Sequence, residues 1–81
     1  MTNLEKYTKV FVETFGVDEE TAKKLNYQDI EAWDSVGHMG LISELEDAFE
    51  ISMDTDDIID FNSYEKGIEI LSKAEYGIEF N

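Results

Sequence analysis

Apolar residues recur at intervals of three and four positions along most of this chain, and the first such stretch covers residues 4–15. This spacing predicts an α-helix with one apolar stripe. Thr2 and Glu5 have the spacing of a capping box at its start, and Gly16 is suited to end it. The apolar positions of this first predicted helix are Leu4, Tyr7, Val10 or Phe11, and Phe15.

A second helix is predicted over residues 35–50, with Asp34 as its N-cap. Leu41, Leu45 and Phe49 follow one another at four-residue spacing, so they form a stripe that turns toward a core. The opposite face of this helix is partly apolar and partly acidic: it carries Val36, Met39, Ser43, Glu46, Asp47 and Glu50. This pattern is typical of a helix that lies on the surface of a small helical protein.

Two further helices are predicted toward the C-terminus. The cluster Asp54, Thr55, Asp56 and Asp57 caps a short third helix over residues 55–60. The fourth helix covers residues 64–75 and ends before Gly77. Its apolar stripe consists of Tyr64, Ile68, Leu71 and Ala74. Residues 78–81 follow as a loosely held tail.

Between the first two long helices lies a connection over residues 17–34. Asp18 caps a short helical stretch that reaches Leu25, and the remainder has no sustained period. Leu25, Ile30 and Trp33 are expected to point inward and close the core. The fold class predicted is therefore all-α: a small four-helix bundle, three longer helices plus one short helix, with a long loop between helices 1 and 2. Residues 1–81 form a single domain, with a core at about 4–75 and a C-terminal tail at 76–81.

The charge of the chain restricts its partners. Twenty acidic residues stand against six lysines, which gives a net charge of −14 over 81 residues. Nucleic-acid binding depends on Lys and Arg contacts to phosphate, so this class of partner is not expected. There is no cysteine and hence no disulfide. No apolar run is long enough for a membrane span and no signal peptide begins at Met1, so a cytoplasmic location is expected. The chain is also expected to be a monomer.

The strongest candidate for chemistry is the pair Asp34–Ser35, which opens the second helix. A helix N-terminus presents free N–H groups and the positive end of the helix dipole. A phosphate ester on the Ser35 hydroxyl would lie in a favourable field there. Such pairs most often only cap a helix, so the pair alone is a weak signal.

A longer pattern around this pair resembles the acyl and peptidyl carrier proteins. Asp34, Ser35 and Val36 correspond to the attachment motif of that family, and the resemblance extends over roughly residues 4–74. The downstream positions that share its spacing are Leu41, Leu45, Glu46, Asp47 and Phe49. The resemblance implies that Ser35 carries a 4'-phosphopantetheine arm, derived from coenzyme A, and that Asp34 supports the attachment reaction. The arm would hold an acyl or aminoacyl intermediate as a thioester in fatty acid, other lipid or polyketide biosynthesis, and the chain would not itself be an enzyme.

The resemblance also implies a docking face on the second helix. The candidate partner-binding residues are Val36, Met39, Glu46, Asp47 and Glu50. The expected partners are a phosphopantetheinyl transferase and the loading ligases, synthases or transferases that present basic patches. The alternative interpretation is a solvated acidic face that serves solubility alone. Gly40 and Ser43 depart from the residues that fatty-acid carriers usually have there, which leaves the identity of the partners and of the cargo open.

Two other functions fit the sequence less well than the carrier interpretation. His38 is the sole histidine and stands three positions after Ser35, but one helix supplies no third group to orient a Ser–His pair. Asp54 and Glu65 have the spacing of the first and last ligands of a calcium loop. That loop needs a ligand and a glycine where Ile58 and Ile59 stand, so no metal site is expected. An acidic helical calcium-binding or protein-interaction module without a prosthetic group remains the alternative.

Overall fold

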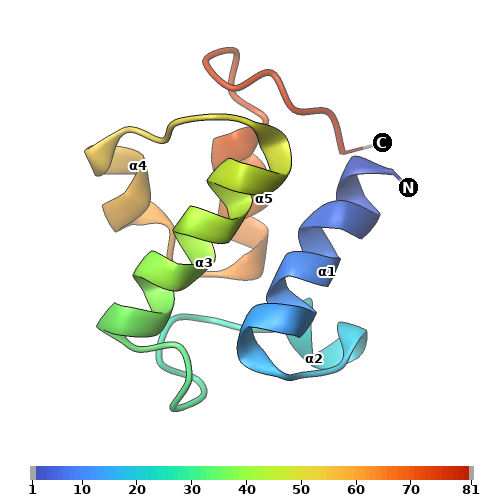
Figure 1. The fold of residues 1–81 in the computed structure, drawn as a ribbon, viewed down its shortest axis with the longest axis vertical. Coiled ribbons are helices and arrows are strands. Elements are labelled where there is room, and N and C mark those ends of the chain that lie inside the picture. Colours follow the sequence, from blue (N-terminus) through green and yellow to red (C-terminus); the bar gives the residue numbers. More distant parts are fainter. Residues whose placement is uncertain (1, 81) are drawn as a thin grey trace.

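The computed structural model describes residues 2–80 and divides them among five helices (Figure 1). They are α1 (Asn3–Phe15), α2 (Glu19–Ala22), α3 (Ser35–Phe49), α4 (Thr55–Asp60) and α5 (Tyr64–Leu71). No strand occurs within residues 2–80; one isolated bridge pairs Asn26 with Ser63. The prediction of an all-α chain is confirmed. In this same range, no helix is long and apolar enough to cross a membrane.

The capping signals at the start of α1 act as predicted. Thr2 Oγ1 accepts a hydrogen bond from the Glu5 N–H at 3.1 Å, and the Thr2 N–H donates to Glu5 Oε1 at 3.0 Å. Hydrogen bonding of the Glu5 carboxylate to the Thr2 backbone, and then to the Thr2 side chain, lowers the pKa of Glu5 below its usual value. Gly16 ends the helix in the left-handed conformation, at φ 65°.

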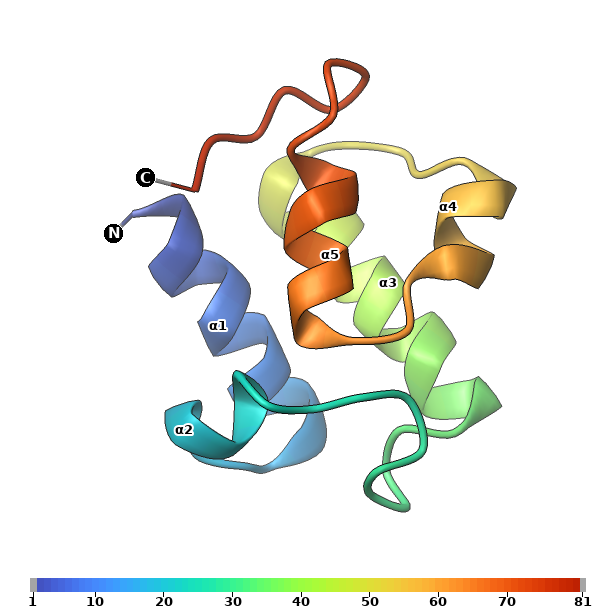
Figure 2. The same ribbon diagram turned by 180° about the vertical axis from the view of Figure 1, so that it is seen from behind.

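Helices α1 and α3 lie side by side, and α5 packs behind α3 in the view of Figure 1 and in front of it in Figure 2. The interior between them is rich in aromatic rings. Tyr7 is fully buried, and its hydroxyl donates to the Tyr64 carbonyl at 2.7 Å. This burial raises the pKa of Tyr7 well above its usual range. The largest fully buried side chains are Trp33, Tyr7, Phe11, Phe61, Leu41, Ile42, Leu45, Ile70 and Leu71.

The connection between α1 and α3 is held by side chains that pack into the core to different extents. Leu25 and Trp33 are buried, as predicted from the sequence, and Ile30 is partly buried against the core. The helical stretch expected over 18–25 is shorter, because α2 ends at Ala22, but Asp18 does cap it by accepting from the Thr21 N–H at 2.8 Å.

The loop after α2 is held against the start of α5 by backbone hydrogen bonds. Leu25 O accepts from Tyr64 N at 3.0 Å, and Tyr27 N donates to Asn62 O at 2.7 Å. The segment before α3 is therefore fixed in place although it lacks regular structure.

The C-terminal region differs from its prediction. Helix α5 ends at Leu71 instead of residue 75, and Ala74 is exposed rather than part of the buried stripe. The loosely held tail is also wrong for residues 78–80. Ile78 is buried and donates its N–H to Leu71 O at 3.2 Å, and the Phe80 ring packs edge-on against Tyr7 at 5.3 Å. The core thus extends past its predicted boundary, and residue 81 lies outside the described residues.

Candidate functional site

The first turn of α3 is fixed by Asp34. Its backbone is extended, and its Oδ1 accepts a hydrogen bond from the Gly37 N–H at 2.8 Å. The Asp34 carbonyl accepts from the His38 N–H at 2.8 Å, which closes the first helical turn. A side chain at Gly37 would collide with the Ala32 carbonyl, so the loop approaches this turn closely. Ser35 is therefore the first helical residue, and it is exposed.

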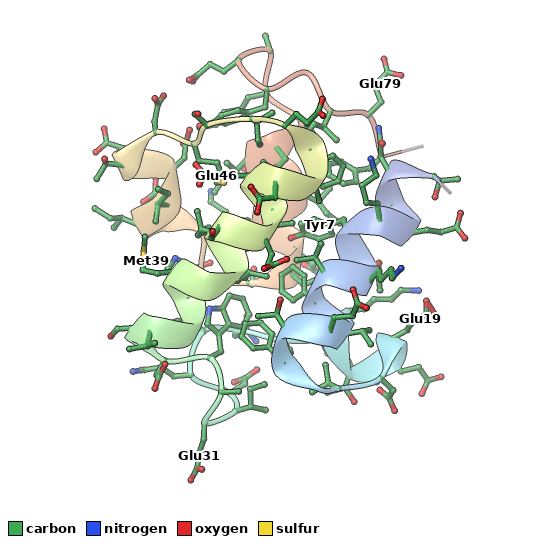
Figure 3. All side chains as sticks on the ribbon, viewed as in Figure 1. Tyr7, Glu19, Glu31, Met39, Glu46 and Glu79 are labelled. Atoms are coloured by element: carbon green, nitrogen blue, oxygen red, sulfur yellow. The ribbon has the colours of Figure 1, made fainter. Side chains whose placement is uncertain are left out.

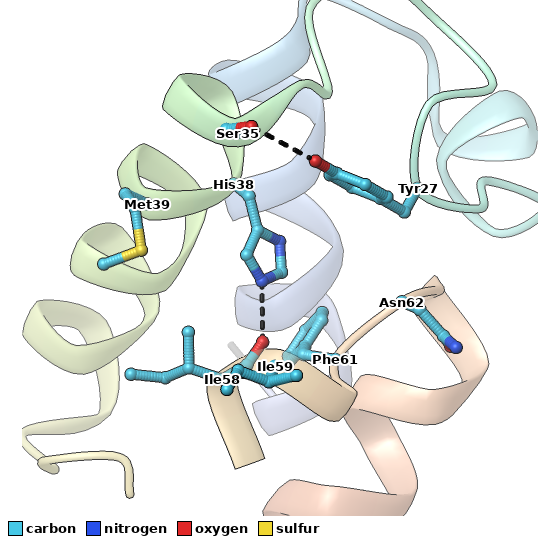
Figure 4. Close-up of a pocket in the computed structure, with 8 residues that line it drawn as sticks. All are labelled: Tyr27, Ser35, His38, Met39, Ile58, Ile59, Phe61 and Asn62. Carbon is cyan, nitrogen blue, oxygen red and sulfur yellow. Dashed lines mark hydrogen bonds between the residues drawn. The ribbon is translucent and has the colours of Figure 1, made fainter. Parts of the chain in front are cut away.

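The Ser35 hydroxyl faces Tyr27 from the preceding loop. Tyr27 Oη lies 3.5 Å from Ser35 Oγ and is, within residues 2–80, its one hydrogen-bond partner (Figure 4). The Tyr27 ring is held edge-on against Trp33 and His38, at centroid distances of 6.2 and 5.6 Å. Tyr27 was not predicted as a site residue, because its proximity to Ser35 depends on how residues 26–34 fold back.

A pocket of about 350 Å³ opens beside Ser35, between the start of α3 and the segment that carries α4 (Figure 4). Most of its wall is apolar. It is lined by Tyr27, Ser35, His38, Met39, Ile58, Ile59, Phe61 and Asn62. The only candidate site residue from the sequence that shares this pocket with Ser35 is Met39.

His38 is half-buried, and both of its ring nitrogens are hydrogen-bonded. Its Nδ1 accepts a hydrogen bond from the Trp33 Nε1–H at 3.0 Å, and its Nε2–H donates to the Ile58 carbonyl at 2.7 Å. These two partners fix the neutral tautomer that carries its proton on Nε2. Because both ring nitrogens are engaged, neither is free to take a proton from Ser35. This geometry agrees with the exclusion of a Ser–His catalytic pair.

Three large apolar side chains are exposed around this site. Val36 is 81% exposed and Met39 is 54% exposed, as predicted for the docking face. Ile59 on α4 is 71% exposed and lies across the pocket from Met39. Ile58 and Ile59 are adjacent on the short helix, so the sequence pattern does not say which of them points inward.

The predicted acidic docking residues lie farther along α3 and differ in their exposure. Asp47 and Glu50 are exposed, and Glu50 ends the helix in the left-handed conformation at φ 55°. Glu46 is only half exposed, and its Oε2 accepts a hydrogen bond from the Met53 N–H at 2.9 Å. Glu46 thus fastens the loop after α3, a structural role that the sequence did not indicate (Figure 3 labels its position on α3).

A second acidic group gathers Asp54, Asp57 and Glu75, whose carboxylate oxygens lie within 4.8 Å of one another. Asp57 is buried, and it accepts from Lys73 Nζ at 2.7 Å and from Tyr76 Oη at 2.6 Å. These hydrogen bonds lower the pKa of Asp57, whereas burial and the bond to Asp57 raise the pKa of Tyr76 to about 12. Lys73 forms an ion pair with Asp57, so the buried carboxylate of this group already has its positive charge.

The calcium-loop spacing fails in the structure as well. Residues 55–60 form helix α4, so they do not make the extended ligand loop that the spacing of Asp54 and Glu65 requires. Asp54 stands at the N-cap of α4 but makes no side-chain capping bond, contrary to the predicted cap.

Comparison with known proteins gives no match: no family model, no curated protein and no solved structure matches this chain. The assignment of function therefore rests on the chain's own residues and on the geometry around Ser35.

Proposed function

We propose that this chain is a carrier protein that holds acyl or aminoacyl groups as thioesters on a 4'-phosphopantetheine arm attached to Ser35 Oγ. The observation that carries the proposal is the position of Ser35. It is an exposed hydroxyl at the first residue of α3, directly after the Asp34 cap, at the mouth of an apolar pocket. A phosphodiester formed there meets the positive end of the helix dipole.

The chemistry requires a thiol that this chain does not contain, since it has no cysteine. In the proposed reaction, Ser35 Oγ attacks the phosphorus of coenzyme A that bears the pantetheine. The bond from this phosphorus to the adenosine bisphosphate breaks, and the hydroxyl proton passes to a base of the transferase. The arm supplies the thiol, and other enzymes then act on the bound group.

The scaffold suits a carrier. Three longer helices with α4 beside them correspond to the four-helix arrangement that we propose for this fold, and the loop of residues 23–34 presents Ser35. Exposed Val36, Met39 and Ile59 offer an apolar contact near the attachment point. Asp47 and Glu50 offer negative charge to basic patches on the transferase and on loading enzymes.

The test is the attachment itself. The full chain is incubated with coenzyme A and a phosphopantetheinyl transferase, and the intact mass is measured. We expect the mass of one phosphopantetheinyl group to be added to the wild type and to the Ser43→Ala control, which removes an exposed serine elsewhere on α3. Ser35→Ala should gain nothing. Modification of Ser35→Ala, or none of the wild type, would refute the proposal.

The alternative is an acidic calcium-binding or protein-interaction module without a prosthetic group. Its distinguishing result is a saturable rise in melting temperature at micromolar calcium with no attachment at Ser35. The helical conformation of residues 55–60 argues against the calcium form of this alternative.

A further inference from the structure

The pocket beside Ser35 is small and ends on an aromatic wall. Its volume of about 350 Å³ is near the lower end of small-molecule sites, which span roughly 300–1,000 Å³. Phe61 is 1% exposed, so it forms the side of the pocket that faces the core, and the His38 ring packs edge-on against it at 6.1 Å. Any chain that enters at Ser35 and continues inward must pass these two rings.

His38 closes this route with two hydrogen bonds. The Trp33 Nε1–H donates to its Nδ1 at 3.0 Å, and its Nε2–H donates to the Ile58 carbonyl at 2.7 Å. The ring is stacked on the Trp33 indole, with centroids 6.2 Å apart and planes 17° apart. The imidazole thus joins the loop before α3, α3 itself and α4 at the point where α3 and α4 would have to separate. Figure 4 shows the hydrogen bond from His38 on α3 to the Ile58 carbonyl on α4.

Behind His38 the core is filled by rings that contact one another. Phe11 is fully buried and lies 5.6 Å from Trp33 and 6.3 Å from Phe61, centroid to centroid. At Gly67 even an added Cβ would collide with the side chains of Tyr7 and Phe61. With the His38 ring in place, an aliphatic chain could enter only by displacing these rings as well, because close-packed interiors do not deform smoothly.

Entry of an aliphatic chain would also leave buried polar groups without hydrogen-bond partners. Within residues 2–80, every buried side-chain nitrogen and oxygen has a hydrogen-bond partner. Displacing the His38 ring would leave the Trp33 indole N–H and the Ile58 carbonyl without theirs, and a buried polar group without a partner is destabilising.

We propose that His38 is a specificity-determining residue: it closes the core to the cargo, so that this carrier serves short acyl or aminoacyl groups, which stay in the surface pocket, rather than long aliphatic chains stored between the helices. The inference rests on the proposed attachment at Ser35. It goes beyond that attachment because it names the class of cargo and the residue that limits it.

The test compares two cargoes on the full chain. Butanoyl- and dodecanoyl-phosphopantetheine are transferred to Ser35 Oγ from the corresponding coenzyme A thioesters by a phosphopantetheinyl transferase, with release of adenosine bisphosphate. The rate at which hydroxylamine cleaves each bound thioester is then measured. A cargo sequestered in the core protects its thioester in proportion to how seldom it leaves. In the wild type we expect the two thioesters to be cleaved at rates within about twofold of each other.

Two variants connect the result with His38. His38→Ala removes the ring, and we expect the dodecanoyl thioester to become at least about fivefold slower to cleave than the butanoyl thioester. His38→Gln retains one acceptor and one donor for Trp33 and Ile58, so it should behave as the wild type. If His38→Ala fails to fold, the wild-type comparison decides, together with the NMR signal of the Trp33 indole N–H, which should be the same with either cargo.

Three results would overturn the inference. They are a dodecanoyl thioester protected in the wild type, a shift of the Trp33 indole signal on loading the dodecanoyl group, and the absence of any protection in a folded His38→Ala chain. In each of these the proposed attachment stands. Failure to load either cargo on the wild type would instead withdraw the proposed function, and this inference with it.

Discussion

The carboxylate of Glu46 on α3 accepts a hydrogen bond from the backbone N–H of Met53, seven residues later, at 2.9 Å. Met53 is buried, and its N–H stands in the loop that leads from α3 to α4. An acidic residue of the predicted docking face therefore also holds the loop that positions one side of the Ser35 pocket. Stability and partner docking must be separated before either is assigned to this residue.

Glu46→Lys should destabilise the fold by about 1–3 kcal/mol, because the Met53 N–H loses its acceptor. Asp47→Lys is the matched control, since Asp47 is exposed and adjacent and its reversal changes the net charge equally. It should leave the free energy of unfolding within about 0.5 kcal/mol of the wild type. Urea denaturation of the two variants measures the difference. Equal stabilities would mean that the Glu46 bond contributes nothing.

Asp47→Lys then tests docking without this complication. Asp47 lies twelve residues after Ser35, about 18 Å along the helix, within reach of an enzyme that covers both positions. At low salt, the rate of loading by the transferase should fall about threefold or more, and the deficit should shrink as salt screens the attraction. Glu19→Lys on α2 makes the same change in net charge at an exposed residue on a different helix.

The Glu19→Lys chain should be loaded at close to the wild-type rate. If both variants were slowed equally, the net charge of the molecule would matter and α3 would hold no special docking face. If neither were slowed, the acidic face would serve solubility alone.

Asp57 should make the free energy of unfolding depend on pH in the acid range. Its pKa is lowered by the hydrogen bonds from Lys73 and Tyr76, so the folded chain releases this proton more readily than the unfolded one. The contribution of Asp57 is complete above the ordinary carboxyl value of 3.8 and is lost as pH falls through the lower value of the folded state. Asp57→Asn should cost about 1–3 kcal/mol at neutral pH, and less below pH 3.8.

The measurement is urea denaturation of the wild type and the variant across this pH range. Asp56→Asn serves as the control, because Asp56 is an exposed acidic neighbour on the same short helix. It should differ little from the wild type at any pH. A cost for Asp57→Asn that stays constant into strong acid would contradict the linkage.

Local signals in the sequence predicted the helix starts well. The capping box of Thr2 and Glu5 and the caps at Asp18 and Asp34 use side chains within three residues of their partners, so short-range spacing reveals them. The apolar periodicity gave α3 to within one residue of its C-terminal end.

The errors come from contacts between distant parts of the chain. Nothing near Leu71 signals that α5 ends there, since Lys73, Ala74 and Glu75 are good helix formers. The chain leaves the helix while Tyr76 reaches back to donate to Asp57 and to accept from the Asp54 N–H at 3.0 Å. In the candidate site, Ser35 and Asp34 were predictable from their own motif. Tyr27 and the bridge through His38 were not, because each depends on a loop folding onto α3.

Two substitutions of Asp34 can separate its role as a helix cap from a role in the attachment reaction. Its Oδ1 accepts from the Gly37 N–H at 2.8 Å, and an asparagine oxygen can make the same bond without the charge. Asp34→Asn should therefore keep the free energy of unfolding within about 0.5 kcal/mol, whereas Asp34→Ala should lose about 1 kcal/mol. Both comparisons are made by thermal or urea denaturation.

The rate of loading by the transferase should group the two Asp34 variants differently from their free energies of unfolding. If the carboxylate charge supports the transfer of phosphopantetheine to Ser35, Asp34→Asn should be loaded at least about tenfold more slowly than the wild type, although its helix start is intact. Asp34→Ala should be as slow, since it lacks the same charge. An asparagine variant that is loaded at the wild-type rate while the alanine variant is slow would show that Asp34 acts only by ordering the first turn of α3. The assignment of its charge to the attachment reaction would then be withdrawn, while Ser35 would remain the proposed point of attachment.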